Sequence, residues 1–306
     1  MKKLSEGNKM FFGVMAIFAV YAVFFILFED YDRNYVMPFE ESSDWHLLLF
    51  SIVVMIVLGV LLHRYARRMD ERISREQADK ENQMRRELTQ NIAHEIKTPV
   101  ASILGYSETL LEHPDMDQAT SRQFIERTQI QAQRLTSLLQ DISTLNRMDY
   151  AASMIAMERV DVSGIVADII QETELAIRKK HMTVRNNMPP CTLSSGNKSL
   201  IYSIFRNLTD NAINYAGDGC TIEINAHLAN GMWHFTFADN GAGIPPEHLP
   251  RIFERFYRVD KGRSREVGGT GLGLAIVKNA VTLHDGTIKA QPAPGGGLCF
   301  EFSLRK

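Results

Sequence analysis

The chain of 306 residues has little cysteine and no large excess of either charge. Its three cysteines, Cys191, Cys220 and Cys299, lie far apart and in no Cys-x-x-Cys spacing, so neither a disulfide framework nor a zinc site is indicated. Free thiols in a reducing compartment are the favoured interpretation. With 34 basic and 36 acidic residues the formal net charge is −2, so no basic field indicates nucleic acid as a partner.

Charge is also missing from two N-terminal stretches, residues 11–28 and 46–62, which are about long enough to cross a bilayer as helices. A cleaved signal peptide is the alternative for the first, but its apolar core is longer than usual and no small-residue cleavage site follows. Basic residues precede the first stretch and follow the second, whereas the loop between them, residues 29–45, is acidic. This asymmetry predicts two membrane spans in contact with lipid, with both termini, including residues 1–10, in the cytoplasm. The loop is too short to bury a core of its own.

Neither glycine nor proline occurs between residue 63 and Pro99, which predicts a long helix whose juxtamembrane part is residues 63–84. Residues 85–150 then show two helical faces with apolar residues at intervals of three and four. The first face comprises Leu88, Ile92, Ile96, Val100, Ile103, Tyr106 and Leu110, and the second Ile125, Thr128, Ala132, Leu135, Leu139 and Ile142. Thr120 or Ser121 is predicted to cap the second helix. Two antiparallel helices cannot bury both faces alone, so a homodimeric four-helix bundle is predicted.

His94 falls roughly opposite the first apolar face and is therefore predicted to be exposed. An exposed imidazole titrates near neutral pH and can act as a nucleophile. Its neighbour Glu95 can accept the ring proton, and Thr98 lies one turn further along the same outer face. An ordinary surface histidine is the alternative. A zinc site of the His-Glu-x-x-His type is excluded because position 98 is threonine.

Residues 158–306 show a different pattern, in which short alternating strands lie between helical segments. Alternation over residues 222–228 and 233–237, on either side of Asn230-Gly231, predicts a β-hairpin. Residues 298–304 predict a further strand. Because helices with apolar faces surround these strands, an α/β sandwich with helices on one side of a mixed sheet is predicted.

Three asparagines interrupt one of these helices at spacings of four and three. Asn207, Asn211 and Asn214 therefore share one helix face. Asparagine is a poor residue for a helix interior, which favours a ligand over stability as the reason for this alignment. Amide oxygens can bind a hard cation such as Mg²⁺, whose other ligands are waters and phosphates.

Two glycine-rich clusters complete the candidate site. Asp239 can accept a hydrogen bond from an exocyclic amine such as that of adenine, and Gly241 and Gly243 let the backbone approach a flat ligand, although a plain turn is the alternative. The second run contains Gly269, Gly271 and Gly273 and precedes a helix, which suits a phosphate site.

A basic segment leads into the second run. Arg258 and Lys261 belong to a loop that can close over a triphosphate, and a solvated loop is the alternative. The spacing does not fit a Walker loop, a dinucleotide fingerprint or the eukaryotic protein-kinase motifs.

Together these segments resemble the sensor histidine kinases of bacterial two-component systems, from the His94 helix to the C-terminus. Residues 94–99 are similar to the phosphoacceptor box, 207–215 to the N box, 239–243 and 269–273 to the two glycine boxes, and 252–257 to the F box. The resemblance implies a dimerisation and histidine-phosphotransfer domain over residues 85–150, followed by an ATP-binding domain of the Bergerat type over residues 158–306.

The resemblance also implies roles. His94 would be the phosphoacceptor, Glu95 its base, and Thr98 a residue for dephosphorylation of the partner. ATP and Mg²⁺ would be the cofactors, with Asn207 and Asn211 on the metal. The implied ATP-binding residues are Asn207, Asn211, Asn214, Tyr215, Asp239, Gly241, Gly243, Arg258, Lys261, Gly269, Gly271, Gly273 and Leu274. The phosphoryl group would pass to an aspartate of a response regulator receiver domain, at the cytoplasmic membrane of a bacterium.

Asn214 departs from the pattern, since the family usually has lysine there, which moves a phosphate contact to Arg258 or Lys261. Three rival functions remain to be weighed. Another ATPase with the same nucleotide fold would lack the His94 segment, and an inactive scaffold would have decayed boxes. A protein that acts mainly as a phosphatase on its regulator stays open.

Overall fold

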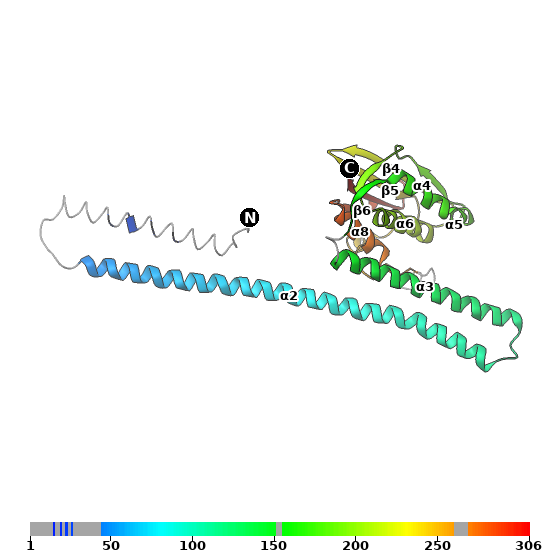
Figure 1. The fold of residues 1–306 in the computed structure, drawn as a ribbon, viewed down its shortest axis with the longest axis horizontal. Coiled ribbons are helices and arrows are strands. Elements are labelled where there is room, and N and C mark those ends of the chain that lie inside the picture. The colour runs from blue at the N-terminus through cyan, green and yellow to red at the C-terminus, as the bar shows by residue number, and fades with distance from the viewer. Residues whose placement is uncertain are drawn as a thin grey trace. The chain divides into compact units, whose positions relative to one another are not determined.

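A computed structural model describes residues 44–150, 155–259 and 269–306, and the single residues 15, 19, 22, 23 and 26 (Figure 1). The predicted N-terminal segment 1–10, almost all of the predicted span 11–28 and of the loop 29–45, and Lys261 lie outside the described residues. Where the structure is described, no helix combines the length and the apolar character that a membrane span requires. The chain divides into two compact units, Met1–Glu87 and Leu88–Lys306.

Helix α2, Asp44–Glu112, begins in the first unit and ends in the second, and α3, Gln118–Tyr150, completes a helical hairpin there. The first helix ends before His113-Pro114, as predicted, and runs through Pro99 without a break in its assignment. The predicted cap of the second helix is wrong. Asp117 caps it instead, because its Oδ1 accepts a hydrogen bond from the N–H of Thr120 at 2.9 Å, three residues into the helix.

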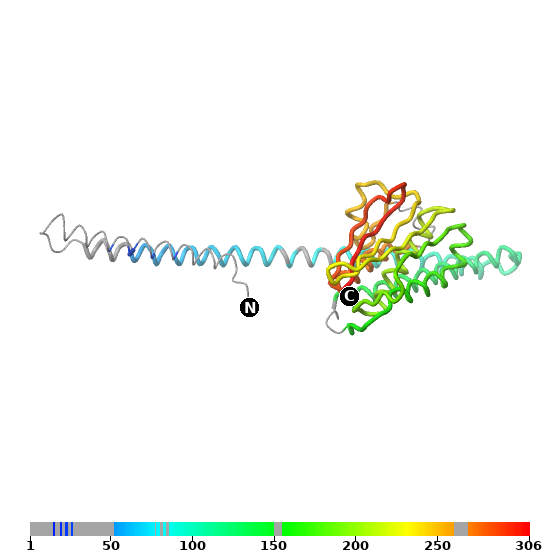
Figure 2. Tube along the Cα trace, turned by 90° about the horizontal axis from the view of Figure 1, so that it is seen from above, coloured from blue at the N-terminus to red at the C-terminus, as the bar shows by residue number. Residues whose placement is uncertain are grey.

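The remainder of the second unit alternates helices and strands. Its elements in chain order are β1 Glu158–Asp161, α4 Val162–Glu172, α5 Glu174–Lys179, β2 Thr183–Asn186, β3 Leu193–Gly196, α6 Lys198–Tyr215, β4 Thr221–Ala229, β5 Met232–Asp239, η2 Pro246–His248, α8 Gly273–Leu283, β6 Ile288–Pro292 and β7 Leu298–Arg305. Five strands form a sheet in the order β2-β4-β5-β7-β6, in which only the β2–β4 pair is parallel. Figure 2 shows β6 and β7 in red beside one another. The predicted mixed sheet is confirmed, whereas the separate β1–β3 pair was not predicted.

The β4–β5 hairpin turns at Asn230 and Gly231, whose φ angles of 52° and 75° are those of a tight hairpin turn. The strands pair in register from Ala229 opposite Met232 to Ile222 opposite Asp239. Because side chains alternate along a strand, one face of β4 and β5 points into the core. Strand β5 ends at Asp239, the residue predicted to contact adenine.

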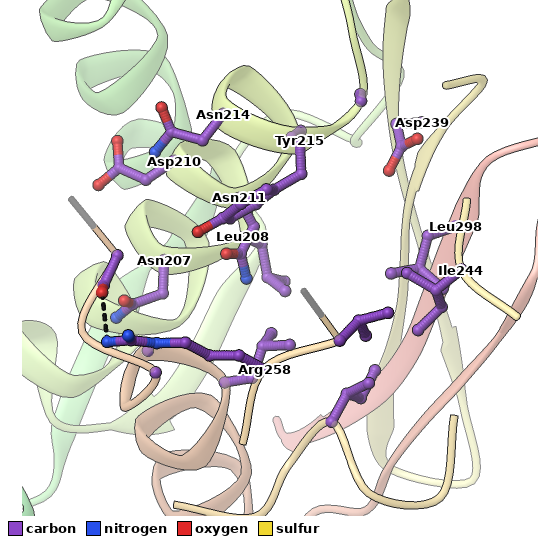
Figure 3. Close-up of a pocket in the computed structure, with 18 of the residues that line it drawn as sticks. Asn207, Leu208, Asp210, Asn211, Asn214, Tyr215, Asp239, Ile244, Arg258 and Leu298 are labelled. Atoms are coloured by element: carbon purple, nitrogen blue, oxygen red, sulfur yellow. Dashed lines mark hydrogen bonds between the residues drawn. The ribbon is translucent and has the colours of Figure 1, made fainter. Parts of the chain in front are cut away.

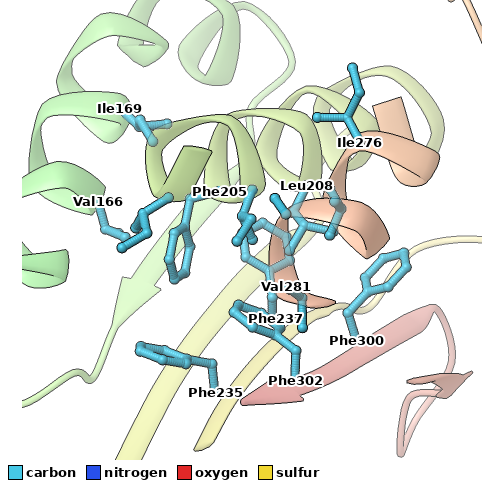
Figure 4. Packing of buried hydrophobic residues seen from close by; sticks show 14 of the residues in the cluster. Val166, Ile169, Phe205, Leu208, Phe235, Phe237, Ile276, Val281, Phe300 and Phe302 are labelled. Atoms are coloured by element: carbon cyan, nitrogen blue, oxygen red, sulfur yellow. The ribbon is translucent and has the colours of Figure 1, made fainter. Parts of the chain in front are cut away.

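The core lies between the sheet and the helices α4, α6 and α8 (Figure 4). Phe205 of α6 makes edge contacts with Phe235 and Phe302 at centroid distances of 5.5 Å each. Because Phe205 and Leu208 point toward the sheet, the asparagines at 207, 211 and 214 occupy a different edge of α6. Packing of the helix on the sheet therefore fixes where the asparagine face points.

Helix α3 packs on α8. Its buried residues are Leu138, Leu145 and Met148, each at most 4% exposed and part of the same core as α6 and α8. Leu139 and Ile125 of the predicted apolar face are instead 51% and 56% exposed. The hairpin thus has a second apolar face, turned toward the α/β domain, which sequence periodicity did not identify.

Candidate nucleotide site

A cavity of about 510 Å³ lies beside α6, between the end of β5 and the segment that leads into α8 (Figure 3). Most of the predicted ATP-binding residues line it: Asn207, Asn211, Asn214, Tyr215, Asp239, Gly243, Arg258, Gly269, Gly271, Gly273 and Leu274. Gly241 is not a lining residue but directly precedes Ala242, which is. His94, Glu95 and Thr98 do not line the cavity. The structure thus brings the nucleotide motifs together and leaves the phosphoacceptor motif outside.

The asparagine edge of the cavity presents amide oxygens. Asn207 donates its Nδ2–H to the carbonyl of Ser203 at 2.8 Å, which turns its Oδ1 away from the helix backbone. A Cβ at position 273 would lie 2.5 Å from this oxygen, so any residue other than glycine there would displace the side chain of Asn207. Where the chain is described, no cluster of three His, Cys, Asp or Glu side chains is placed to hold a metal. Amide oxygens completed by phosphate oxygens and waters are nevertheless a suitable donor set for Mg²⁺.

The opposite end of the cavity is built around Asp239 (Figure 3). Burial raises the pKa of this carboxyl, and backbone N–H groups of Gly241 and Leu298 oppose the shift. The Gly241 N–H donates to Oδ1 at 2.9 Å. Gly297, with φ of 89°, packs so closely on the backbone of Asp239 that any side chain would collide. The three-glycine turn before β7 was not identified as part of the site, because glycine runs reveal a turn but not the segment it packs against.

Apolar side chains complete the wall near Asp239. Ile244, Ile252, Leu298 and Phe300 line the cavity, and none of them was predicted as a site residue. In the sequence they were indistinguishable from other core or loop hydrophobics. One acceptor set in an apolar wall suits a flat, mostly apolar ring that carries an exocyclic amine, as adenine does.

Arg258 is the basic side chain among the described residues that line the cavity. Its side chain is 7% exposed, and its Nη2 donates to Glu95 Oε2 at 2.9 Å and to the carbonyl of Gly269 at 2.7 Å. Its Nε is buried and has no hydrogen-bond partner within the described part of the chain. A buried donor left unpaired is costly, and a phosphate oxygen in the cavity would satisfy it.

The glycine run leads directly into the N-terminus of α8. Gly271 has φ of 74°, and its carbonyl accepts a hydrogen bond from the N–H of Phe256 at 2.8 Å. Leu272 occupies the N-cap position without a side-chain cap, while the hydroxyl of Thr270 accepts its N–H at 3.2 Å. The first N–H groups of α8 together with the helix dipole favour an anion, which fits a phosphate of the nucleotide.

His94 is exposed on α2, as predicted. Its neighbour Glu95 is engaged elsewhere, because Oε2 contacts Arg258 at 2.9 Å and Arg134 Nη2 at 3.4 Å. Thr98 is also exposed, and its hydroxyl donates to the carbonyl of His94 at 3.3 Å. Glu95 thus connects the hairpin to Arg258 of the cavity, a contact that the sequence did not reveal.

Two protein families match this chain, one over the segment that forms the cavity and one over the helical hairpin. Residues 196–306 match the family described as histidine kinase-, DNA gyrase B- and HSP90-like ATPase, and residues 84–151 match the His Kinase A (phospho-acceptor) domain. The chain therefore contains an ATPase domain of this family and a His Kinase A (phospho-acceptor) domain. From here on, residues 196–306 are called the ATPase domain and residues 84–151 the phospho-acceptor hairpin.

Relatives of known name and structure agree with this assignment. The chain is 36% identical over 255 residues to the sensor-like histidine kinase SenX3 of Mycobacterium tuberculosis, which covers 80% of this chain and 62% of that protein. It thus spans about three fifths of the length of that relative. Two solved structures share the fold. The histidine kinase AdeS of Acinetobacter baumannii has a TM-score of 0.56 at 21% identity, covering 69% of this chain and 97% of that one. The histidine kinase ThkA in complex with the response regulator TrrA has a TM-score of 0.58 at 20% identity, covering 75% and 66%.

Proposed function

We propose that this chain is a membrane-bound sensor histidine kinase, which moves the γ-phosphoryl group of ATP onto His94 and then onto an aspartate of a cognate response regulator. One observation carries the proposal. An exposed histidine in a phospho-acceptor hairpin occurs in the same chain as a cavity that combines an amide edge, an unpaired buried Arg258 donor and a helix N-terminus. The hairpin distinguishes this function from that of other ATPases of the same fold.

The chemistry follows from the side chains. A ring nitrogen of His94 forms a bond to the γ-phosphorus while the bond to the bridging oxygen of ADP breaks, and the other ring nitrogen loses its proton to Glu95. Arg258 and the N-terminus of α8 stabilise charge on the phosphoryl oxygens. Asn207 and Asn211 are the residues that would hold Mg²⁺, which when bound offsets charge on the phosphates.

His94 does not line the cavity of its own chain in this arrangement. Phosphorylation therefore requires the ATPase domain to move relative to the hairpin, or a cavity supplied by a second protomer. Movement of the ATPase domain would open the Glu95–Arg258 pair and free Glu95 for the imidazole ring, while the Nε of Arg258 remains available for a phosphate oxygen. Apolar side chains exposed on the hairpin, such as Leu104 and Leu139, support the homodimer that was predicted from the sequence.

The partner and the reverse reaction are also part of the proposal. ThkA was solved in complex with the response regulator TrrA, which supports a receiver domain as the partner of a similar hairpin. The exposed Thr98, one turn after His94, is placed to orient a water for dephosphorylation of that partner. Its hydrogen bond to the helix backbone is equally compatible with a purely structural role.

Membrane insertion rests on the sequence alone, through the apolar stretches 11–28 and 46–62 and the acidic loop between them. Two spans would place both termini in the cytoplasm of a bacterium and the loop outside the cytoplasmic membrane. Replacing Asp32 in the loop by cysteine should allow labelling of intact cells by a membrane-impermeant thiol reagent. Labelling only after lysis would contradict this topology.

Incubation of the full chain in membranes with γ-labelled ATP tests the central step. We expect one label that is lost in acid and retained in base, as a phosphoramidate is, and His94→Gln should abolish it while nucleotide binding persists. The matched control is His113→Gln, another exposed histidine of the hairpin, which should label normally. Label retained on the His94→Gln protein would refute the assignment.

A further inference from the structure

One carboxylate lies in the otherwise apolar face that α3 presents to α8. Leu138, Asp141, Leu145 and Met148 are spaced by three and four, so they share that face, and the three hydrophobic members are buried. Burial raises the pKa of Asp141, and nearby Asp210 acts in the same direction. A carboxylate in such a setting is costly unless a hydrogen bond offsets the loss of water.

The partner of Asp141 belongs to the glycine run of the nucleotide cavity. The hydroxyl of Thr270 donates to Asp141 Oδ2 at 2.7 Å, and the same oxygen of Thr270 accepts the N–H of Leu272 at 3.2 Å. Leu272 is fully buried and is the N-cap residue of α8. The hairpin is thereby connected, through one hydroxyl, to the helix end that faces the phosphates.

Among the described residues, few other hydrogen bonds hold the glycine run. Gly269, Gly271 and Gly273 have no side chains to pack, and glycine loses the most conformational freedom on being ordered. From the side of the ATPase domain, the run is held by the hydrogen bond from Phe256 to Gly271 and by Arg258 at Gly269. From the side of the hairpin, Asp141 holds the glycine run at Thr270, two residues before Leu272, the N-cap position of α8.

We propose that Asp141 is a positioning residue of the nucleotide site, which fixes Thr270 and through it the start of α8, so that affinity for ATP depends on the hairpin. The inference rests on the proposed role of this cavity as the ATP site. It gives movement of the hairpin a direct route to nucleotide affinity, in addition to any effect on the position of His94. Asp141 touches neither nucleotide nor His94 in this role.

A simpler explanation is that Asp141 only docks the ATPase domain on the hairpin. The structure offers a control for this, because Arg255 Nη2 pairs with Asp149 Oδ2 at 2.8 Å across the same contact. Neither Asp149 nor Arg255 lines the cavity. A docking effect should appear in Asp149→Asn as well as in Asp141→Ala, whereas a positioning effect should appear only in the second.

Two measurements on the full chain test the proposal: the dissociation constant for Mg²⁺ with a non-hydrolysable ATP analogue, and the KM and kcat of His94 labelling. Asp141→Ala and Thr270→Val should each raise the dissociation constant and KM roughly tenfold, the size of one hydrogen bond to a charged group, with kcat within about twofold. The double variant should bind the analogue as tightly as the weaker-binding single variant does, because the two substitutions remove the same hydrogen bond. Asp141→Asn and Thr270→Ser keep an acceptor and a hydroxyl, and both should bind within about threefold of the original protein.

Equal effects of Asp149→Asn and Asp141→Ala, additive effects of Asp141→Ala and Thr270→Val, or unchanged binding by Asp141→Ala would each overturn the proposal. If Asp141→Ala fails to fold, Thr270→Val against the original threonine decides the matter, since valine is isosteric with threonine and replaces only the hydroxyl by a methyl group. The proposed function fails separately. Absence of label on His94 in the unmodified protein would refute the kinase assignment, while analogue binding would still report on Asp141.

Discussion

The phospho-acceptor hairpin and the ATPase domain bury their apolar residues to different extents. In the ATPase domain, Phe205, Phe235 and Leu272 are at most 1% exposed. In the hairpin, Leu104, Ile125, Ile130 and Leu139 are 51–59% exposed and Leu111 is 81% exposed. The ATPase domain therefore completes its core within one chain, whereas the hairpin buries only the face turned toward α8 and leaves apolar surface that a second protomer can cover.

Because of this difference in burial, substitutions that stop catalysis should be distinguishable from substitutions that weaken the dimer. A change in the cavity should stop chemistry and leave the dimer intact, whereas a change on the exposed face of the hairpin should weaken the dimer and leave nucleotide binding intact. Contacts between the two parts, such as Glu95–Arg258 and Asp141–Thr270, are the exceptions that connect them.

The largest effect is expected from Asn211→Asp. The change keeps the size of the side chain but places a second carboxylate next to Asp210, in the cavity where we propose that Mg²⁺ and the triphosphate bind. We expect His94 labelling to fall at least about a thousandfold, a loss on the scale of 4 kcal/mol of transition-state stabilisation. Initial rates of labelling measure the effect, and a normal far-ultraviolet circular dichroism spectrum and dimer mass would show that the fold is intact. Normal turnover by the folded variant would remove Asn211 from the metal side of the site.

A smaller effect, on the other part of the molecule, is expected from Leu139→Glu. Burying an unpaired charge in a dimer interface should weaken self-association by about 2–3 kcal/mol, or roughly 30- to 150-fold. Sedimentation of the detergent-solubilised chain measures the dimer fraction, and analogue binding should stay unchanged. Gln140→Glu, an equal charge change on the next exposed residue, is the matched control. Equal dimer fractions for the two variants would show that Leu139 faces solvent in the assembled protein.

Sequence periodicity was sufficient to predict the orientation of a helix or strand where one of its faces is in a single environment, either the core or the solvent. The β4–β5 hairpin, the asparagine edge of α6 and the exposure of His94 were all predicted in this way. The cap of α3 was missed because Asp117 and Thr120 are both good cap residues, and only the reach of the side chain decides between them. The β1–β3 pair was missed because four-residue strands carry too little pattern.

Long-range pairing was the part that the sequence did not supply. The spacing of Leu138, Asp141 and Leu145 does not indicate whether these residues pack against α8 or against the hairpin of a second protomer. Glu95 was predicted to act as the base beside His94, and its contact with Arg258, which joins positions 163 residues apart, was not predicted. The same holds for the turn at Gly297, whose position next to Asp239 depends on the pairing of β5 with β7.

A further prediction locates acid sensitivity in the ATPase domain. His284 is 2% exposed, its Nε2 accepts the N–H of Asn197 at 2.9 Å, and its ring Nδ1 lies 2.6 Å from the carbonyl of Ala280. This pairing requires the neutral ring. Burial accordingly lowers the pKa of His284 below the ordinary value of 6.5, although the Ala280 carbonyl and Asp285 oppose the shift.

The sign of the effect follows from linkage. Below about pH 6.5 the unfolded chain takes up a proton at His284 that the folded chain refuses, so the free energy of unfolding falls as pH drops from about 6.5 toward the lowered folded pKa. Above pH 6.5 this contribution is fully present. Urea unfolding of the ATPase-domain transition at pH 7.5 and 5.5 should show a larger loss for the original protein than for His284→Gln, which cannot titrate. His181→Gln, at an exposed histidine between α5 and β2, should behave as the original does, and a loss of equal size in His284→Gln would show that other groups carry the acid sensitivity.

The smallest effect on labelling is expected from Thr98→Ala, and it also bears on the direction of phosphoryl flow. The Thr98 hydroxyl is exposed one turn from His94, and its hydrogen bond to the His94 carbonyl uses its proton but leaves oxygen lone pairs available for a water. Loss of the hydroxyl should leave His94 labelling within about twofold, because the nucleophile and the cavity are unchanged, but should prolong the lifetime of the phosphorylated regulator, since positioning of water supplies most of the catalysis of that hydrolysis. The measurement is the decay of regulator phosphate with ADP and either form of the kinase. Ser102→Ala is the matched control, because Ser102 donates to the Thr98 carbonyl at 3.1 Å in the same manner, one turn further from His94. A lifetime prolonged by both variants, together with a parallel fall in labelling, would mean that the hydroxyl of Thr98 serves only the helix.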